Sequence, residues 1–161
     1  MNSRTESSIP FVGLHAHSVA GSPFDALGYP PEHMDFAYNN GMDALALTDH
    51  GNMNGLAWQV LHAKKMKKAG KEFKPIFGCE AYFIPSVAKW KEEYEEIKNA
   101  SKKKSDYEAD NSGTTVEDEG ASKKKIKSVL NRRRHLILLA MNQKGLQNIF
   151  KMISRSYSGD N

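Results

Sequence analysis

The sequence predicts an α/β fold in which strands and helices alternate, as in a parallel sheet or a β/α barrel. The first observation is a set of four apolar runs with the length and composition of strands, at residues 11–17, 43–49, 75–84 and 135–141. The second is that helix-like stretches lie between or after these runs. The third is that histidines and acidic residues cluster near the ends of the runs, where parallel α/β folds carry their ligands.

Three helices are predicted from their end signals and apolar spacing. Pro30-Pro31-Glu32 opens the first and Gly41 stops it, because proline suits the first helical turn and glycine the C-terminal end. Residues 52–69 form the second, which closes with a basic turn and Gly70. Residues 142–156 form the third, with one apolar stripe. The apolar stripes comprise Leu56, Val60, Leu61, Met66, Leu146, Ile149, Phe150 and Ile153, and we expect Trp58, Met66 and Phe150 in the core.

One polar segment, residues 89–134, interrupts this alternation. It is rich in Lys, Glu, Ser and Asp, and residues 105–122 have the composition of a disordered chain. Its flanks, 90–97 and 124–130, are expected to form short helices. We interpret the segment as an insertion on the surface of the domain. Its lysine runs are interpreted as solvated loop, and a basic track for DNA is the alternative.

The composition suits one soluble domain or a large part of one. The chain has 161 residues, of which 39% are hydrophobic, and a net charge of +4. We expect a polar tail at residues 1–10 and a domain over 11–161. No apolar run approaches the roughly 20 residues of a membrane helix, so we expect no membrane association. The single cysteine, Cys79, excludes an internal disulfide, favours a cytoplasmic location and is expected in the core.

Three histidines and a glutamate form a candidate metal site. His15 and His17 lie two residues apart on a predicted strand, so their rings share one face. His50 ends the next strand. Glu80 lies within an apolar strand, where burial of an unpaired carboxylate is costly and a metal ion relieves the cost. Imidazole and carboxylate are ligands of divalent Zn, Mn and Fe, so we expect these side chains to converge on a metal.

Other residues near these motifs receive different interpretations. Asp49 points to the opposite face of its strand from His50, so we expect it to orient an imidazole or to bond a loop amide. His33 and His62 lie on predicted helices and are interpreted as surface histidines.

The motifs, in this order, resemble the start of the polymerase and histidinol phosphatase (PHP) domain, and more closely the PHP domain of C-family bacterial replicative DNA polymerases. The resemblance covers nearly the whole chain outside residues 89–134. The matching segments are Leu14-His15-Ala16-His17-Ser18, Leu47-Thr48-Asp49-His50-Gly51-Asn52-Met53, Phe77-Gly78-Cys79-Glu80, His135-Leu136-Ile137-Leu138-Leu139-Ala140 and Gly145-Leu146-Gln147-Asn148-Ile149.

The resemblance implies a distorted, TIM-like β/α barrel whose strand ends hold up to three divalent metals, with Zn, Mn, Fe or Mg as candidates. Carried over to this sequence, it adds two ligands to the four above. His135 matches a family histidine. Asp25, in Ser22-Pro23-Phe24-Asp25-Ala26, matches a family aspartate but stands one residue further along than usual.

The family's barrel continues through strands that supply a cysteine and an Asp-x-His pair, which this sequence lacks. We therefore expect a partial barrel of about four strands, with an incomplete metal site. The chain would be the N-terminal part of a longer polypeptide, without a polymerase active site and with weak metal binding and little nuclease activity by itself.

The resemblance also implies a function. We expect part of a DNA polymerase III alpha subunit whose complete PHP domain is a metal-dependent phosphoesterase or 3′–5′ exonuclease. Its partners would be DNA, the remainder of the polymerase chain and a proofreading subunit. The alternatives are a free-standing PHP phosphatase of the histidinol-phosphatase kind and a non-catalytic scaffold module of the polymerase.

Overall fold

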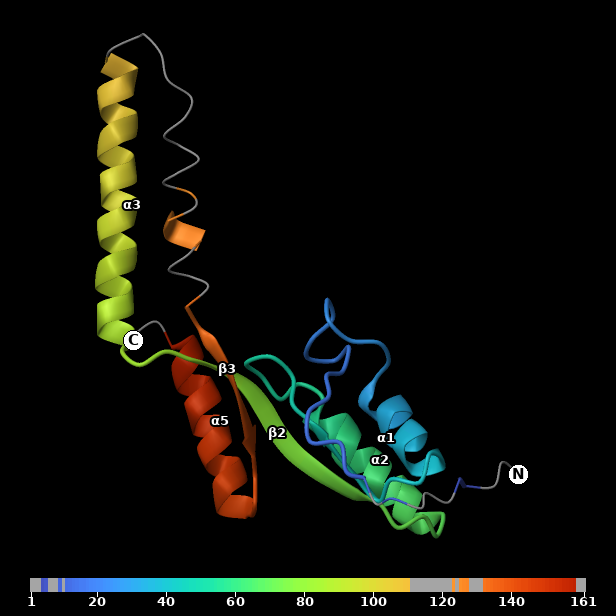
Figure 1. Ribbon diagram of the computed structural model, residues 1–161. Helices are drawn as coiled ribbons and strands as arrows, with labels where there is room; N and C mark the ends of the chain where they lie inside the picture. Colours follow the sequence, from blue (N-terminus) through green and yellow to red (C-terminus); the bar gives the residue numbers. More distant parts are fainter. Residues whose placement is uncertain are drawn as a thin grey trace. The chain divides into compact units, whose positions relative to one another are not determined.

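The computed structural model describes residues 4–5, 9, 11–110, 123, 125–127 and 132–158. In chain order the elements are α1 (Pro30–Asn39), β1 (Ala44–Leu47), α2 (Leu56–Lys68), β2 (Lys74–Phe83), α3 (Val87–Asp110), β3 (Arg134–Leu139) and α5 (Gln143–Tyr157) (Figure 1). The chain forms two compact units. The first comprises Met1–Ala81 with Leu136–Asn161, and the second comprises Tyr82–His135.

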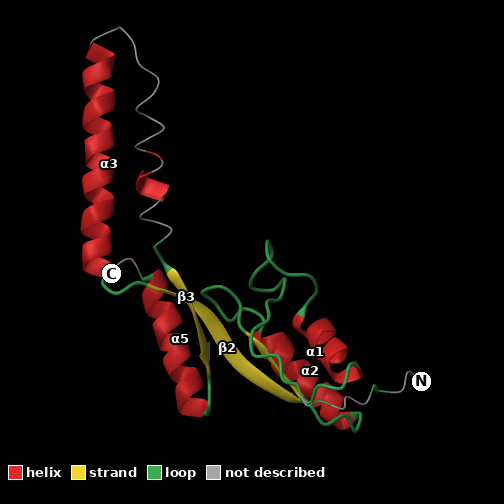
Figure 2. Ribbon diagram, viewed as in Figure 1, coloured by secondary structure: helices red, strands yellow, loops and turns green. Residues whose placement is uncertain are grey.

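The fold is mixed α/β with an open three-stranded sheet in the order β1-β2-β3 (Figure 2). β1 pairs with β2 in parallel, from Ala44 opposite Lys74 to Leu47 opposite Phe77. All four residues of β1 are buried, as expected for an apolar run covered on both faces. The described residues form an open sheet, and the expected closed barrel is not observed among them.

Residues 11–17 do not form the predicted first strand. They run beside β1, with Gly13 bridged in parallel to Leu45. The carbonyls of Gly13 and Ala16 accept hydrogen bonds from the amides of Ala46 and Thr48, each at 2.8 Å. These contacts are too few for a regular strand, and three of the segment's apolar side chains remain exposed, Phe11, Val12 and Leu14. The apolar sequence predicted an extended backbone correctly but not a complete ladder.

The helices of the first unit begin and end where local hydrogen bonds dictate. α1 starts at Pro30, and the Tyr29 amide in front of it donates to Glu32 Oε2 at 2.7 Å. Its end is marked by Gly41, whose φ of +87° favours glycine. α2 begins at Leu56, four residues later than predicted. The reason is that the Asn52 amide group bonds two loop carbonyls instead of starting a helix.

The core of the first unit includes Met34, Ala37, Leu45, Leu47, Met66 and Cys79. Burial of Met66 and Cys79 was predicted. The placement of Trp58 and Phe150 was wrong, because their exposed fractions are 52% and 37%. The Trp58 ring lies against Tyr29 at the surface, with ring centroids 5.7 Å apart. Apolar spacing identified the helices, but it did not distinguish core positions from those at the edge of the stripe.

The second unit contains α3, which is longer than the helix predicted at 90–97. Residues 105–110, expected to be disordered, belong to this helix, and 111–122 lie outside the described residues. A solvated helix and a disordered chain share a Lys- and Glu-rich composition, which explains the error. Of the other predicted helix, 124–130, residues 125–127 are described and helical. None of the described helices has the length and hydropathy needed to cross a bilayer.

Candidate metal centre

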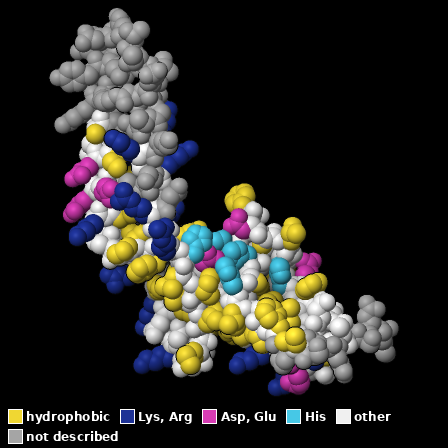
Figure 3. Space-filling view, viewed as in Figure 1, with side chains coloured by type: hydrophobic (Ala, Val, Ile, Leu, Met, Phe, Trp, Pro, Cys, Tyr) yellow, Lys and Arg dark blue, Asp and Glu magenta, His cyan; other side chains and the backbone are white. Residues whose placement is uncertain are grey.

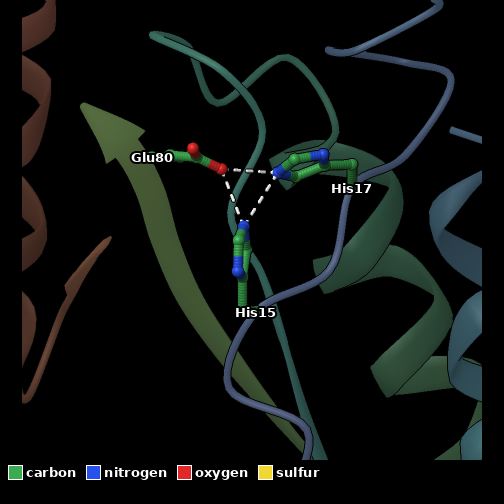
Figure 4. A group of neighbouring side chains, drawn as sticks. All are labelled: His15, His17 and Glu80. Atoms are coloured by element: carbon green, nitrogen blue, oxygen red, sulfur yellow. Dashed lines mark hydrogen bonds and ion pairs between the residues drawn. The ribbon is translucent and has the colours of Figure 1, made fainter. Parts of the chain in front are cut away.

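Three predicted ligands from two parts of the chain meet at one point. His15 and His17 come from the extended segment beside β1, and Glu80 comes from β2. Glu80 Oε2 lies 2.7 Å from His15 Nε2 and 2.7 Å from His17 Nε2, and the two nitrogens are 3.1 Å apart (Figure 4). The Glu80 side chain is 1% exposed. A buried carboxylate oxygen therefore faces two imidazole nitrogens in a closed triangle.

The spacing of this triangle is close to that of ligands around one ion. Ligand atoms about 2.0–2.2 Å from a metal lie about 2.9–3.5 Å apart. The two Glu80 contacts, at 2.7 Å, also have the length of hydrogen bonds from an imidazole N–H to a carboxylate. As hydrogen bonds they would direct two protons to one acceptor oxygen, whereas a cation would be contacted by a lone pair of each of the three atoms. The three side chains are thus a suitable donor set for a divalent cation.

A second group of ligand-type side chains shares His17 with the first. His50 follows β1 and forms a parallel bridge with Glu80, so the strand pairing places it beside the triangle. His50 Nε2 lies 3.0 Å from Asp25 Oδ2, and His50 Nδ1 lies 3.7 Å from Glu80 Oε1. One ligand atom each of His17, Asp25 and His50 lies within 4.8 Å of the others. Within the first unit the structure thus brings together His15, His17, Asp25, His50 and Glu80.

Asp49 holds the loop that follows His17. Its side chain accepts hydrogen bonds from the Ser18 amide at 2.6 Å, the Ser18 hydroxyl at 2.8 Å and the Ser22 hydroxyl at 3.0 Å. Asp49, Ser18 and Ser22 are all buried. Gly21 lies so close that a Cβ there would be 2.6 Å from Asp49 Cβ. The contact with a loop amide matches one of the two roles expected for Asp49, and it fixes the backbone that carries His17.

A hollow of about 410 Å³ opens beside the histidines, lined by His15, Ala16, His17, Asp25, Ala26, Leu27 and His33. Figure 3 shows histidine side chains gathered next to acidic ones on one face. His33 was interpreted as a surface histidine, but it lines this hollow. Its Nε2 is buried without a hydrogen-bond partner among the described residues. No sequence signal marked His33, because only the packing of α1 brings it to the hollow.

Two further histidines, His62 and His135, have contacts of their own. His62 is not the surface histidine we expected, since its side chain is 11% exposed and its Nε2 pairs with Asp35 at 3.0 Å. His135 belongs to the second unit, where its exposed ring packs edge-on against Tyr82 with centroids 5.1 Å apart. Its role as a ligand stays a prediction. Cys79 is fully buried, and burial raises the pKa of its thiol to about 11.

Comparison with known proteins places these motifs in context. The family described as "PHP domain" matches residues 13–161. DNA polymerase III subunit alpha of Treponema pallidum is 31% identical over 147 residues, which cover 91% of this chain and 9% of that protein. DNA polymerase III PolC-type of Thermotoga maritima is 40% identical over 82 residues, which cover 51% of this chain and 6% of that protein. The chain therefore spans about a tenth or less of the length of these relatives.

Two solved structures share part of the backbone. A metal-dependent phosphoesterase from Bifidobacterium adolescentis has a TM-score of 0.39 at 18% identity, over 45% of this chain and 23% of that one. A two-domain protein containing a PHP-like metal-dependent phosphoesterase, from Bacteroides vulgatus, has a TM-score of 0.37 at 25% identity, over 53% of this chain and 28% of that one. These partial likenesses bear neither on the fold nor on the site.

Proposed function

The chain belongs to the PHP domain family, and on that premise we propose that His15, His17 and Glu80, with His50 and Asp25, hold divalent metal ions for phosphoester hydrolysis. The observation that carries the proposal is the triangle of His15 Nε2, His17 Nε2 and Glu80 Oε2. His135 is proposed as a further ligand on the basis of the family motif. The mixed imidazole and carboxylate set favours Zn, Mn or Fe over Mg, which prefers oxygen ligands.

The proposed role of each residue follows from its position in the site. A bound divalent ion supplies Lewis acidity toward a phosphate oxygen and lowers the pKa of a water molecule. Glu80 contributes negative charge to the cavity from a buried position and aligns both imidazoles through one oxygen atom. Asp25 is 56% exposed and lies against His50 Nε2, so it would complete the second group of donors at the solvent side of the site. Asp49 keeps the backbone after His17 in place.

We propose DNA as the substrate, with hydrolysis at its 3′ end, and the remainder of a replicative polymerase and a proofreading subunit as partners. The support is the similarity to alpha subunits over 91% of the chain. In this proposal residues 11–161 contribute to a PHP barrel, 1–10 form a tail and 89–134 form an insertion. A histidinol-phosphatase-like activity is the second candidate. The hollow of about 410 Å³ favours this second candidate, because the hollow would hold a small phosphomonoester.

Metal binding is tested by calorimetric titration of the metal-free chain with Mn²⁺ and Zn²⁺. We expect His15→Ala, His17→Ala and Glu80→Gln each to weaken binding by at least about tenfold, since each removes one donor of the triangle. The matched control is His62→Gln, because His62 is engaged with Asp35 and should leave the affinity unchanged. Equal metal affinity in Glu80→Gln and the unaltered chain would refute the metal centre.

The substrate is tested by comparing initial hydrolysis rates in Mn²⁺ on a single-stranded oligonucleotide and on histidinol phosphate. The proposal predicts that any hydrolysis releases nucleotides from the 3′ end and disappears in Glu80→Gln. Faster turnover of histidinol phosphate than of DNA would favour the second candidate. Metal binding without hydrolysis of either compound would agree both with the low activity expected of this chain by itself and with a non-catalytic module.

A further inference from the structure

The loop between His17 and α1 is fastened at both ends and presents a fixed tip. At its base the Val19 amide donates to the Gly28 carbonyl at 2.9 Å. Ser18 and Ser22 are tied to Asp49, as described above. Within the loop, the Asp25 amide donates to the Ser22 carbonyl at 3.1 Å. A loop closed in this way holds its tip, residues 23–27, in a defined position at the surface.

The tip is apolar, although exposed loop tips are usually polar or small. Phe24 is 98% exposed and Leu27 is 90% exposed. They flank Asp25, which lies against His50. Isolated exposed apolar side chains are ordinary, but two large ones on a fixed loop beside a polar cluster indicate a contact surface.

This tip borders the hollow beside the histidines. Leu27 and Ala26 line the hollow together with His15, His17 and His33. A ligand whose phosphate reaches the His15–His17–Glu80 triangle therefore has the apolar tip next to it. A small phosphomonoester with a polar body gains little from this neighbour. A nucleotide at the end of a DNA strand gains more binding energy, because the aromatic face of its base can stack against Phe24 and Leu27.

We infer that Phe24 and Leu27 form an apolar platform that receives the terminal nucleobase of a DNA strand while the adjacent triangle engages its terminal phosphodiester. This inference rests on the proposed function and adds how the substrate is selected. Contact through the face of the base is tolerant of sequence, since each base presents a π surface. The platform should therefore select for the presence of a terminal base rather than for its identity.

The test is a comparison of two short thymidine oligonucleotides labelled with fluorescein at the 5′ end. One carries an ordinary 3′-terminal nucleotide and the other carries an abasic terminal sugar, and both have a terminal phosphorothioate linkage to slow hydrolysis. Affinity for the full chain is measured by fluorescence anisotropy in Mn²⁺. We expect the strand with the terminal base to bind about 5- to 150-fold more tightly, the range for stacking of one base.

The preference should vanish in Phe24→Ala and shrink in Leu27→Ser, while affinity for the abasic strand is retained. Phe36→Ala is the matched control, because Phe36 is an exposed phenylalanine (67% exposed) on α1 rather than on the tip at residues 23–27. An unchanged preference in Phe24→Ala, equal binding of both strands by the unaltered chain, or binding of neither would overturn the inference. Loss of self-association in Phe24→Ala with unchanged DNA binding would also overturn it. Mn²⁺ binding is titrated separately, and its absence would refute the proposed function instead.

Discussion

Removal of the Asp49 carboxylate is expected to destabilise the protein and loosen the metal centre together. Asp49→Ala deletes three hydrogen bonds, from the Ser18 amide, the Ser18 hydroxyl and the Ser22 hydroxyl. Ser18 is 0% and Ser22 4% exposed, so the lost partner is not readily replaced by water. A hydrogen bond to a charged group contributes about 1.5–3 kcal/mol. Because the three bonds share one acceptor group and are not additive, we expect a loss of about 3–5 kcal/mol in the free energy of unfolding.

Urea denaturation monitored by circular dichroism gives the stability, and calorimetric titration with Mn²⁺ gives the affinity. We expect metal affinity to fall about 10- to 100-fold in Asp49→Ala, since the loop after His17 is released. Asp49→Asn should retain more stability, because its amide oxygen still accepts from the Ser18 amide and the Ser22 hydroxyl. Asp43→Asn is the control. Asp43 is exposed near the start of β1 and pairs with Arg4 at the surface, where an ion pair contributes little, so stability should change little and metal affinity should not change. If Asp49→Ala matched Asp43→Asn in both, the reasoning about the loop would be refuted.

Three further predictions concern packing, ionisation and helix capping. Gly78→Ala places a Cβ 2.6 Å from the Leu138 carbonyl oxygen, so the free energy of unfolding should fall by about 1–3 kcal/mol in a urea titration. Gly145→Ala is the control, because a Cβ there meets only ordinary contacts and should not destabilise the protein. Burial raises the pKa of the Cys79 thiol from 9.0 to about 11. At pH 8 the thiol should therefore react with a disulfide reagent far more slowly in the folded chain than in urea. Rapid reaction of the folded chain would contradict the burial of Cys79. Because the unfolded thiol ionises at the lower pKa, its contribution to stability is full below about pH 9 and declines between about pH 9 and 11. Asn142→Ala removes the side-chain acceptor for the Gly145 amide at the start of α5, so the free energy of unfolding should fall by about 1 kcal/mol. The assay is thermal melting, and an unchanged melting temperature would show that this cap does not stabilise the protein.

Local elements were predictable where a short sequence carries its own geometric requirement. Pro30 and Gly41 bound α1, because these residues fix a backbone angle without help from distant residues. The metal-binding candidates were recognisable for a similar reason. Two histidines at period two share a face, and Glu80 is an acidic residue within an apolar strand.

Other predictions failed where the outcome depends on neighbours in space. Residues 11–17 lack a full hydrogen-bonded ladder, although their composition is that of a strand. Trp58 and Met66 lie on the same helix, yet only Met66 is buried, because burial depends on what packs against each side of the helix. Residues 105–110 are helical, although their composition equally suits a disordered chain.

The sequence by itself determined the residue types of the site, the approximate positions of its strands and the family to which the chain belongs. The tertiary structure decided which of those residues meet. Parallel pairing of β1 with β2 brings His50 to Glu80 across thirty residues of sequence, and the Asp49 contacts bring the 18–22 loop to the same point. It also placed His33 and Leu27 in the lining of the hollow and left Phe24, on the same loop as Leu27, exposed. Such proximity arises from packing and long-range hydrogen bonds, which local sequence patterns do not encode.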